Sequence, residues 1–566
     1  ETINTELQAL HQQCPELIVL SPDPNIYLQK PLSHAKSLLG KTLNWIVLDC
    51  RQGFPLDYFL CAANTIQNNG AFMIIWQPNS TDEQSSRFHT EQIPTNNFQR
   101  YLSLGLERYS QIWHNNDVTR TTLSAPIEHN LTTSQQQVLN ALQAQTAGIT
   151  TLFAPRGTGK SFVVAEFLRT LSHNYIITAP NQNALQSYTN IPLNFMAPDY
   201  LFLNHESISQ SWLIIEEAAQ MPIAHLEKLS KLADNGLLIS SVENYEGTGK
   251  GLESKLADII TIDHALTLSE RQRFEANDPL AQFCDYISLQ GTITTPLTDG
   301  TYLYSGENLS TFQNNFELVQ HFYQFMNQYH YQTNAQDIRR LFDSPNTTII
   351  ITVHNHKIVG GIWAIHEGEL PQSLAEDVFN GYRRPKGNLV VQTLAAHSYY
   401  PELMTLKSLR ISRIAVDATY RHQGIAKSLL NQLINFGKTH EYDFLSTSFG
   451  LTASLLRFWQ QCEFTWIHLG SHRDKTTGLH AAILLFPLPD TFAHPINVMQ
   501  RKWHNDAFHL SQAPFIHSAI RSILREYQSK GRYDALDQRI LEAHHHHKKP
   551  VEAAFSALER QKLQLD

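Results

Sequence analysis

Two short segments of the chain combine residue types and spacing that suit phosphate binding. The first reads APRGTGKS over residues 154–161, and the second reads RHQGIAKS over residues 421–428. Each places glycine just before a segment with helical apolar spacing, where backbone N–H groups at a helix N-terminus can bind phosphate oxygens. The two loops lie far apart in the sequence, which predicts two phosphate-bearing ligands on one chain.

The first loop follows the GxxxxGK[ST] pattern of triphosphate-binding loops, with Ala154 at the position of the first glycine. A short apolar run precedes it, and FVVAEFLRTL follows it, as a strand and a helix would. We expect Lys160 to contact the β and γ phosphates and Ser161 to bind Mg²⁺. The residues of this loop that are predicted to bind ATP are Gly157, Thr158, Gly159, Lys160, Ser161 and Phe162.

A pair of carboxylates extends the predicted ATPase chemistry. The segment SWLIIEEAA, residues 211–219, is an apolar strand that ends in Glu216 and Glu217. The pair resembles that of helicase-type NTPases, in which the first acid holds Mg²⁺ through water and the second orients the attacking water. By this resemblance Glu216 joins Ser161 in the metal site, where Asp is more usual, and Glu217 is catalytic.

Two further positions fit the ATPase prediction, and a third segment carries a second GTGK. Gln135 in LTTSQ corresponds to a glutamine that reads the adenine edge, which predicts ATP as the nucleotide. Arg273 in LSERQRF is predicted to bind ATP and to act catalytically by stabilising charge on the γ-phosphate. The segment VENYEGTGKG, residues 242–251, has no Ser or Thr after Lys250, so we interpret it as a loop that senses nucleotide or RNA.

The second loop follows a strand, RIAV, and its core RHQGIA matches the pattern [RQ]xxGx[GA] that surrounds the pyrophosphate of coenzyme A. Over roughly residues 311–490 the chain resembles the Gcn5-related N-acetyltransferases. That resemblance implies that the end of the strand offers a backbone N–H to the thioester carbonyl, and that an amine attacks directly. By chemistry alone, His397 and His472 are candidates for the general base. The residues predicted to bind acetyl-CoA are Ile414, Ala415, Val416, Arg421, His422, Gln423, Gly424, Ile425, Ala426 and Lys427.

Along nearly all its length the chain resembles the tRNA(Met) cytidine acetyltransferases. Besides the segments above, the resemblance rests on GYRRPKGNLVVQTLAAH, STSFG and RFWQQCEF. It implies acetylation of the N4 amine of the wobble cytidine, position 34, of elongator tRNA(Met), with ATP hydrolysis driving RNA remodelling. Arg383, Arg384 and Lys386 are expected to contact RNA phosphates. The alternatives are a remodelling ATPase fused to a protein or polyamine acetyltransferase, and an RNA chaperone that senses acetyl-CoA.

The elements that must position these residues predict a multidomain α/β protein. Continuous apolar strands alternate with helical segments, which favours a parallel sheet covered on both faces. We expect an N-terminal α/β domain (1–113), a RecA-like P-loop ATPase domain (126–310), a Gcn5-related N-acetyltransferase domain (311–490) and a helical tRNA-binding tail (491–566). The tail carries the histidine run 544–547, for which a solvated face is a simpler interpretation than a metal site.

Composition limits the class of protein further. Apolar residues make up 42% of the chain, which allows large buried cores, and the net charge of −9 argues against a general nucleic-acid coat. Membrane-spanning runs and a secretion signal are not recognisable in the sequence. The five cysteines are scattered and odd in number, which favours buried thiols in a reducing cytoplasm. We therefore expect a cytoplasmic enzyme with acetyl-CoA, ATP and Mg²⁺ as ligands, tRNA as partner, and no obligatory protein partner.

Overall fold

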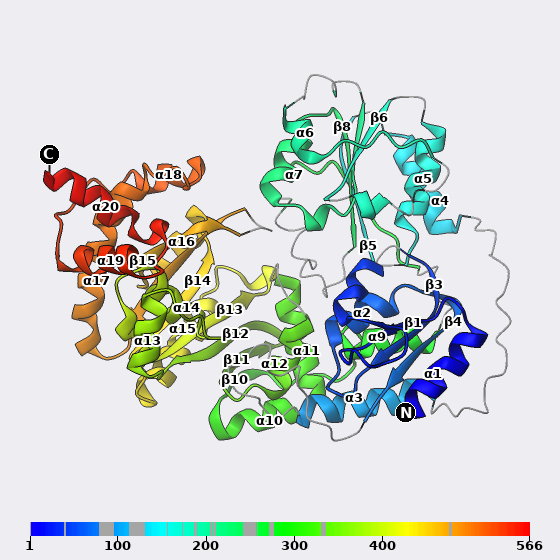
Figure 1. Cartoon of the computed structure of the whole chain (residues 1–566), viewed down its shortest axis with the longest axis horizontal. Helices are drawn as coiled ribbons and strands as arrows, with labels where there is room; N and C mark the ends of the chain where they lie inside the picture. The colour runs from blue at the N-terminus through cyan, green and yellow to red at the C-terminus, as the bar shows by residue number, and fades with distance from the viewer. Residues whose placement is uncertain are drawn as a thin grey trace. The chain divides into compact units, whose positions relative to one another are not determined.

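The structure is a computed structural model that forms two compact units (Figure 1). Unit 1 comprises residues 1–86, 92–294 and 319–343, and unit 2 comprises residues 87–91, 295–318 and 344–566. In the described part of the chain, every helix is too short or too polar to span a membrane. The structure describes all residues except 1, 39–40, 78–95, 112–130, 146, 156, 172–173, 181, 186–187, 189–190, 204–207, 209–210, 242–255, 257–258, 271–276, 330–334, 475–477 and 566.

The N-terminal part of unit 1 is a small parallel sheet with the strand order β2-β1-β3-β4. The predicted strands over 44–50 and 71–78 correspond to β3 and β4, and the helix predicted between them is α2. The elements are α1 (Thr2–Gln13), β1 (Ile18–Leu20), β2 (Gln29–Lys30), β3 (Leu43–Asp49), α2 (Leu56–Ala63), β4 (Ile66–Ile75) and α3 (Asn96–Tyr109).

Helices from much later in the chain complete this N-terminal core. Helix α9 (Pro279–Ile287) packs on α3, and the rings of Tyr101 and Tyr286 stack at 4.2 Å while each hydroxyl donates to the other residue's carbonyl. Helix α12 (Ala335–Asp343), which follows α11 (Phe316–Tyr329), ends in Asp343. The Asp343 carboxylate accepts from the N–H groups of Asn97 and Phe98 and so caps the N-terminus of α3. The N-terminal core therefore depends on segments on both sides of the second sheet in the sequence.

The second sheet of unit 1 is also parallel, with the order β6-β7-β8-β5-β9. Alternate residues of each strand enter two different cores, because successive side chains point to opposite faces: Ile214 lies in one core, and Leu213 and Ile215 lie in the other. This is the doubly covered parallel sheet that the continuous apolar strands predict. Its elements are α4 (Thr133–Gln143), β5 (Gly148–Ala154), α5 (Lys160–Thr170), β6 (Tyr175–Thr178), α6 (Pro198–Leu203), β7 (Trp212–Ile215), α7 (Ile223–Ser230), β8 (Asn235–Ser241) and β9 (His264–Leu266).

Unit 2 is built on a seven-stranded sheet with the order β10-β11-β12-β13-β14-β16-β15. Neighbouring strands are antiparallel except β13 and β14, which pair in parallel. The strands are β10 (Gly300–Tyr304), β11 (Thr347–His354), β12 (Lys357–Gly368), β13 (Lys407–Val416), β14 (Phe444–Gly450), β15 (Thr465–Arg473) and β16 (His480–Pro487).

Helices cover both faces of this sheet. One core joins α15 to Leu409 and Ile411 of β13, and the other joins α13 and α14 to the start of β14 and to β16. The C-terminal helices contribute to both cores; Trp503 of α17, for example, packs against Trp466 at 4.7 Å. The helices are α10 (Leu309–Asn314), α13 (Gln372–Phe379), α14 (Leu389–His397), α15 (Ile425–Thr439), α16 (Ala453–Gln461), α17 (Asp490–Leu510), α18 (Ser518–Leu524), α19 (Ala535–His546) and α20 (Val551–Leu565).

Candidate active sites

The first candidate site lies at the carboxyl end of β5, where the strand turns into α5. Gly157 and Gly159 have φ values of +74° and +83°, which glycine adopts without strain. Ala154 is the last residue of β5, is fully buried and pairs with Ser241, so its position requires a small side chain but no special backbone conformation. Lys160 begins α5, and its Nζ donates to the carbonyls of Ala154 and Pro155, both at 2.9 Å.

Strand β7 brings the predicted acidic pair to the same edge of the sheet. The Ser161 hydroxyl donates to Glu216 Oε1 at 2.9 Å, which joins the loop after β5 to the end of β7 across the intervening β8. The longer arm of Glu replaces the usual Asp without loss of this contact. Glu217 follows with φ +47°, a left-handed conformation that is uncommon for a residue other than glycine and recurs at functional sites.

A third residue, absent from the sequence prediction, completes this cluster. Tyr188 is 5% exposed, and its hydroxyl donates to Glu216 Oε1 at 2.6 Å. Burial, with Glu216 close by, raises the pKa of Tyr188 well above its ordinary value, so the phenol remains a hydrogen-bond donor. A tyrosine about thirty residues from the nearest motif carries no local signal, because only the fold brings it to Glu216.

The oxygen ligands at this cluster are of the type that Mg²⁺ prefers: one hydroxyl, from Ser161, and one carboxylate, from Glu216. Gln135 lies beside the same loop, because its side-chain N–H donates to Thr158 O at 2.9 Å while its Oε1 accepts from Thr132 N. A carboxamide has a second N–H and a second lone pair, so one donor and one acceptor remain for an adenine edge. Arg273 and the loop 242–251 lie outside the described residues.

The second candidate site lies where β13 and β14 separate. The parallel ladder between them joins Ser408–Ile411 to Phe444–Thr447 and ends there. Beyond that point β13 continues along β12 as far as Val416, and β14 continues along β16 as far as Gly450. The β12–β13 register shifts between Ile411 and Arg413, so Ser412 lies in a bulge next to the opening. The sheet therefore opens between two strands, at a place where N–H groups of β13 face the gap rather than a partner strand.

The predicted coenzyme A loop follows β13 directly. Gly424 has φ +82° and caps α15, and the loop from Arg421 to Gly424 is exposed. A Cβ built on Gly424 would meet no protein atom within 4 Å, so the space in front of the helix N-terminus is open. A Cβ on Gly360 of β12, by contrast, would lie 2.6 Å from Ile425, which shows how closely α15 packs on the sheet. The helix N-terminus, the glycine and the open space together suit a pyrophosphate.

The basic segment 381–387 leads into α14, whose start is linked to β13 through a carboxylate of β12. It connects α13 to α14, and Arg383, Arg384 and Lys386 are all exposed. The carboxylate of Glu367, which is 1% exposed, accepts from the N–H groups of Leu389 and Val390 at the start of α14. It also accepts from Arg410 Nε of β13 at 2.6 Å. Helix α14 and its preceding loop are thus positioned relative to β13 by one buried carboxylate.

The C-terminal tail anchors the same segment from the other side. Lys549 is 2% exposed, and its Nζ donates to Phe379 O at the end of α13 and to Ala395 O and Ala396 O at the end of α14. The backbone N–H of Lys548 donates to Asn380 O, and Tyr382 OH lies 3.0 Å from Nδ1 of His547.

The histidine run 544–547 therefore contributes one contact to the basic segment and otherwise faces solvent or the backbone. His545 and His546 are exposed, and Nδ1 of His544 lies 2.9 Å from Lys549 O. Among the described residues, three or more His, Cys, Asp or Glu side chains do not come together as a metal site. A second buried network, of Arg560 with Asp506 (2.7 Å) and Asp537 (2.6 Å), joins α20 to α17 and α19. The sequence prediction missed Glu367 and Lys549, whose partners are distant in sequence.

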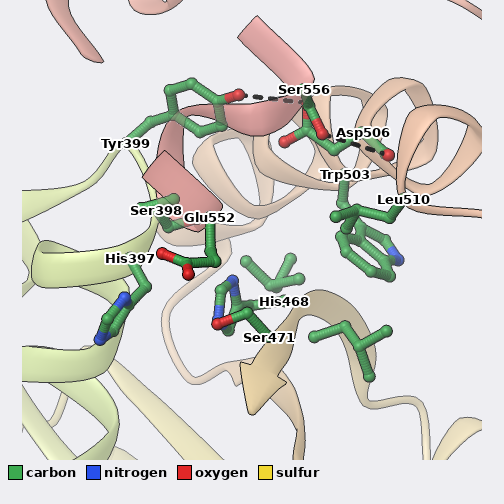
Figure 2. A pocket seen from close by; sticks show the side chains of 13 residues that line it. His397, Ser398, Tyr399, His468, Ser471, Trp503, Asp506, Leu510, Glu552 and Ser556 are labelled. Atoms are coloured by element: carbon green, nitrogen blue, oxygen red, sulfur yellow. Dashed lines mark hydrogen bonds between the residues drawn. The ribbon is translucent and has the colours of Figure 1, made fainter. Parts of the chain in front are cut away.

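The two candidate general bases lie close together near the end of α14. His397 Nε2 is 3.3 Å from a guanidinium nitrogen of Arg384, and His472, at the end of β15, lies near enough to lower the pKa of His397. His397 also lines a cavity of about 30 Å³, with His468, Ser471 and Glu552 among its other walls (Figure 2). That volume holds one or two water molecules. Burial lowers the pKa of His397 to about 4 and that of His468 to about 3, so both rings are neutral near pH 7.

The two sites define a class of protein: a P-loop ATPase of helicase type joined to a Gcn5-related N-acetyltransferase. Comparisons with known families agree. Residues 9–116 match the family model "tRNA(Met) cytidine acetyltransferase TmcA, N-terminal", and residues 187–289 match "RNA cytidine acetyltransferase NAT10/TcmA, helicase domain". Residues 322–442 and 426–489 match "GNAT acetyltransferase 2".

Curated relatives cover most of the chain. A tRNA(Met) cytidine acetyltransferase TmcA of Actinobacillus pleuropneumoniae is 32% identical over 81% of this chain and 78% of its own length. Its counterpart in Pectobacterium atrosepticum is 30% identical over 94% of this chain and 82% of its own length. The chain belongs to the tRNA(Met) cytidine acetyltransferase family. Among solved structures, the S18-alanine N-acetyltransferase of Escherichia coli matches 33% of this chain and 94% of its own, with 13% identity and a TM-score of 0.22.

Proposed function

We propose that the chain acetylates the N4 amine of the wobble cytidine, position 34, of elongator tRNA(Met), with acetyl-CoA as donor and ATP hydrolysis driving RNA remodelling. One observation carries the acetyl-transfer half of this proposal. Glu367 holds the start of α14 and Arg410 of β13 at once, so an exposed basic loop is fixed to the strand that lines the opening in the sheet. An acetyltransferase for a small amine has no need of that loop.

The chemistry of cytosine explains why an ATPase accompanies the transferase. The exocyclic N4 amine is conjugated with its ring and is a weak nucleophile, so it requires alignment and removal of a proton. In a stacked or paired base the amine is also inaccessible, and extruding a nucleotide costs a few kcal/mol. ATP turnover by the P-loop site supplies a means of rearranging the anticodon loop.

The roles that we propose for residues in ATP hydrolysis are based on the contacts at the carboxyl ends of β5 and β7. Lys160 would meet the β and γ phosphates, Ser161 would bind Mg²⁺, Glu216 would hold the same ion through water, and Glu217 would orient the attacking water. When bound, Mg²⁺ would neutralise negative charge on the phosphates. Residues 421–427 and the end of β13 would bind acetyl-CoA. The proposed partner is tRNA, and the proposed location is the cytoplasm.

The test is transfer of labelled acetate from acetyl-CoA to three acceptors: elongator tRNA(Met), a ribosomal protein mixture and a polyamine. We expect label in the tRNA only, and N4-acetylcytidine on nucleoside analysis of the product. Replacing cytidine 34 by uridine should abolish transfer. Label only in the protein mixture or the polyamine would show that the transferase has a different acceptor.

The contribution of the basic loop is measured by the salt dependence of tRNA binding. Changing Arg383 and Arg384 together to Ala should weaken binding and reduce the log–log salt slope by about 0.7–0.9 for each phosphate that is no longer neutralised. Lys438→Ala, at the exposed C-terminal end of α15, is the control and should leave the slope unchanged. An unchanged slope in the double variant would place the RNA surface elsewhere.

A further inference from the structure

The register of the sheet locates His468 relative to the opening between β13 and β14. The ladder between these strands ends at the pair Ile411–Thr447. The next residue of β14, Ser448, pairs with Ile483 of β16, and Ile483 pairs with His468 of β15. His468 therefore lies on the row where the opening begins, two strands or about 10 Å away along the sheet.

The length of α14 is consistent with a position of His397 near the row of paired residues that contains His468. Its N-terminus is bound by Glu367, which pairs with Ser408 on the row three residues before Ile411. Nine helical residues span about 13 Å, close to the roughly 10 Å that separate those rows. His397 and His468 line one cavity, so the end of α14 lies beside β15 (Figure 2).

His397 lies on the face of the sheet opposite the coenzyme A loop. Leu409 and Ile411 pack against α15, whereas Arg410, between them on β13, points to Glu367 and so to α14. A thioester held at the N-terminus of α15 reaches the opening from one face. An acceptor amine that follows the basic loop reaches it from the other face, where His397 lies.

Several charged or titratable groups face His397, from four elements. Arg384 of the basic loop is 3.3 Å from Nε2, Lys549 precedes α20, Glu552 lies on α20, and His472 and His468 lie on β15. Arg384 and Lys549 favour the neutral imidazole, and Glu552 opposes them. In the hydrogen bond with Arg384, the guanidinium donates and Nε2 accepts.

We propose that His397 accepts the proton released by the attacking amine, and that Arg384 covers its Nε2 until an RNA phosphate draws the guanidinium away. The inference rests on the proposed function and deepens it, because it names the base and the signal that releases it. Arg384 would act as a positioning residue and His397 as a catalytic residue.

The proton and electron pairs balance without a further reactant. The N4 lone pair forms the C–N bond to the acetyl carbonyl carbon, and the electron pair of the C–S bond leaves on sulfur. The proton lost from N4 goes to His397 Nε2 and returns through solvent to the thiolate. RNA binding also acts on the base: burial is the largest cause of the low pKa of His397, and moving Arg384 away while bringing a phosphate near raises that pKa.

The first test compares His397→Ala with the same change at His440, an exposed histidine at the end of α15. Single-turnover acetate transfer to elongator tRNA(Met) should fall by about 10²–10⁴-fold in His397→Ala, with acetyl-CoA and tRNA affinities preserved. Added imidazole should restore part of the rate in this variant only. His440→Ala should transfer acetate at the wild-type rate. Retained acetyl-CoA binding shows that the variant is folded.

The second test uses the pH dependence of the rate, because kcat/KM reports the free enzyme and kcat the bound complex. In wild type, the acid limb of kcat should lie at higher pH than that of kcat/KM. Arg384→Ala removes the positive charge beside His397 and should bring the two acid limbs together, whereas Lys438→Ala, at the exposed end of α15, should leave them apart.

Three results would overturn the inference while wild-type protein still acetylates tRNA. The first is acetate transfer at the wild-type rate by His397→Ala. The second is a loss of transfer in His397→Ala that imidazole does not restore, together with acid limbs that Arg384→Ala does not change. The third is a loss of transfer in His472→Ala but not in His397→Ala. Absence of transfer to tRNA by the wild-type protein is a different result, because it contradicts the proposed function itself.

Discussion

At the scale of single residues, Tyr188 offers a test of how the proposed Mg²⁺ ligand Glu216 is held in place. Its buried hydroxyl donates to Glu216 Oε1, as the Ser161 hydroxyl does, so both hydrogen bonds orient the carboxylate. Tyr188→Phe should preserve packing but release Glu216. Because groups that orient a metal ligand typically contribute 10–100-fold, we expect ATP hydrolysis to fall by about that factor and to require more Mg²⁺.

The measurement is a Mg²⁺ titration of phosphate release, together with binding of a fluorescent ATP analogue with and without Mg²⁺. Tyr175→Phe is the control, because its hydroxyl donates to the exposed Pro192 carbonyl in the same unit. An unchanged Mg²⁺ requirement in Tyr188→Phe would mean that this hydrogen bond stabilises the fold only.

A substitution at Gly424 separates two effects: the loss of stability from backbone strain and the loss of acetyl-CoA affinity from a steric block. Gly424→Ala puts a Cβ into open space at φ +82°, so the folded protein loses only about 1 kcal/mol to the left-handed backbone. The same methyl group lies where we propose that the pyrophosphate approaches, so acetyl-CoA affinity should fall at least tenfold. Isothermal titration with acetyl-CoA and thermal unfolding measure the two effects.

Gly306 provides a matched control for this change. It also has a positive φ, +55°, and a Cβ there would meet no protein atom within 4 Å. Gly306→Ala should lower stability by a similar amount and leave acetyl-CoA affinity intact. Equal affinities in the two variants would show that the phosphates do not approach Gly424.

The residues that could be predicted from the sequence are those whose chemistry is local. Lys160, Ser161 and Gly424 each belong to a loop of a few residues between a strand and a helix, so spacing alone places them. Tyr188 and Glu367 act across the fold: each meets partners that another element supplies, and neither has a motif of its own. Single-sequence patterns report local periodicity and turns, and they carry no information about such pairings.

At the scale of elements, Lys549 joins the ends of α13 and α14, where carbonyl groups otherwise remain unsatisfied. Lys549→Met removes the donor of three carbonyls, two of them buried, and losing the partner of a buried group costs about 1–3 kcal/mol. We expect unit 2 to unfold at lower denaturant concentration and tRNA binding to weaken, because the basic loop between these helices is no longer fixed. Lys548→Met, at the exposed neighbouring position, should have little effect on stability.

The titration of Lys549 gives this prediction a pH dependence. Burial lowers its pKa from 10.5 to about 7, so between these values the unfolded state binds more protons than the folded state. The free energy of unfolding of the wild-type protein should therefore gain a contribution that rises with pH from about 7 to 10.5. Denaturant unfolding across this range should show the rise in wild type and its absence in Lys549→Met. Equal slopes would mean that Lys549 is charged throughout.

Elements were predictable where apolar runs are continuous, and less so where helices depend on tertiary contacts. Strands β5 to β8 of the ATPase sheet match apolar segments read directly from the sequence. Helix α17 does not: Pro495 falls within its second turn, where proline normally interrupts a helix, and packing of residues such as Trp503 against the sheet stabilises it nonetheless. The tail therefore has a structural role in the acetyltransferase core that its composition does not reveal.

At the scale of the whole molecule, the two phosphate loops belong to different units, and each unit has its own cores. Composition and strand patterns could predict two such modules. They could not predict that α9 and α12, from beyond the ATPase sheet, complete the N-terminal core, because that packing joins segments nearly 200 residues apart or more. Separate cores imply that damage to one phosphate loop leaves the other ligand site folded.

That independence predicts opposite phenotypes for two single changes. Lys160→Ala removes the cation that we propose meets the β and γ phosphates, so ATP hydrolysis should be lost while acetyl-CoA affinity stays at the wild-type value. Gly424→Glu puts bulk and negative charge against the pyrophosphate, so acetyl-CoA binding and acetate transfer should disappear while tRNA-stimulated ATP hydrolysis persists. Phosphate release and acetate transfer are measured with elongator tRNA(Met) on one preparation of each variant. Loss of both activities in either variant, with the protein folded by thermal unfolding, would show that the two sites work only as one assembly.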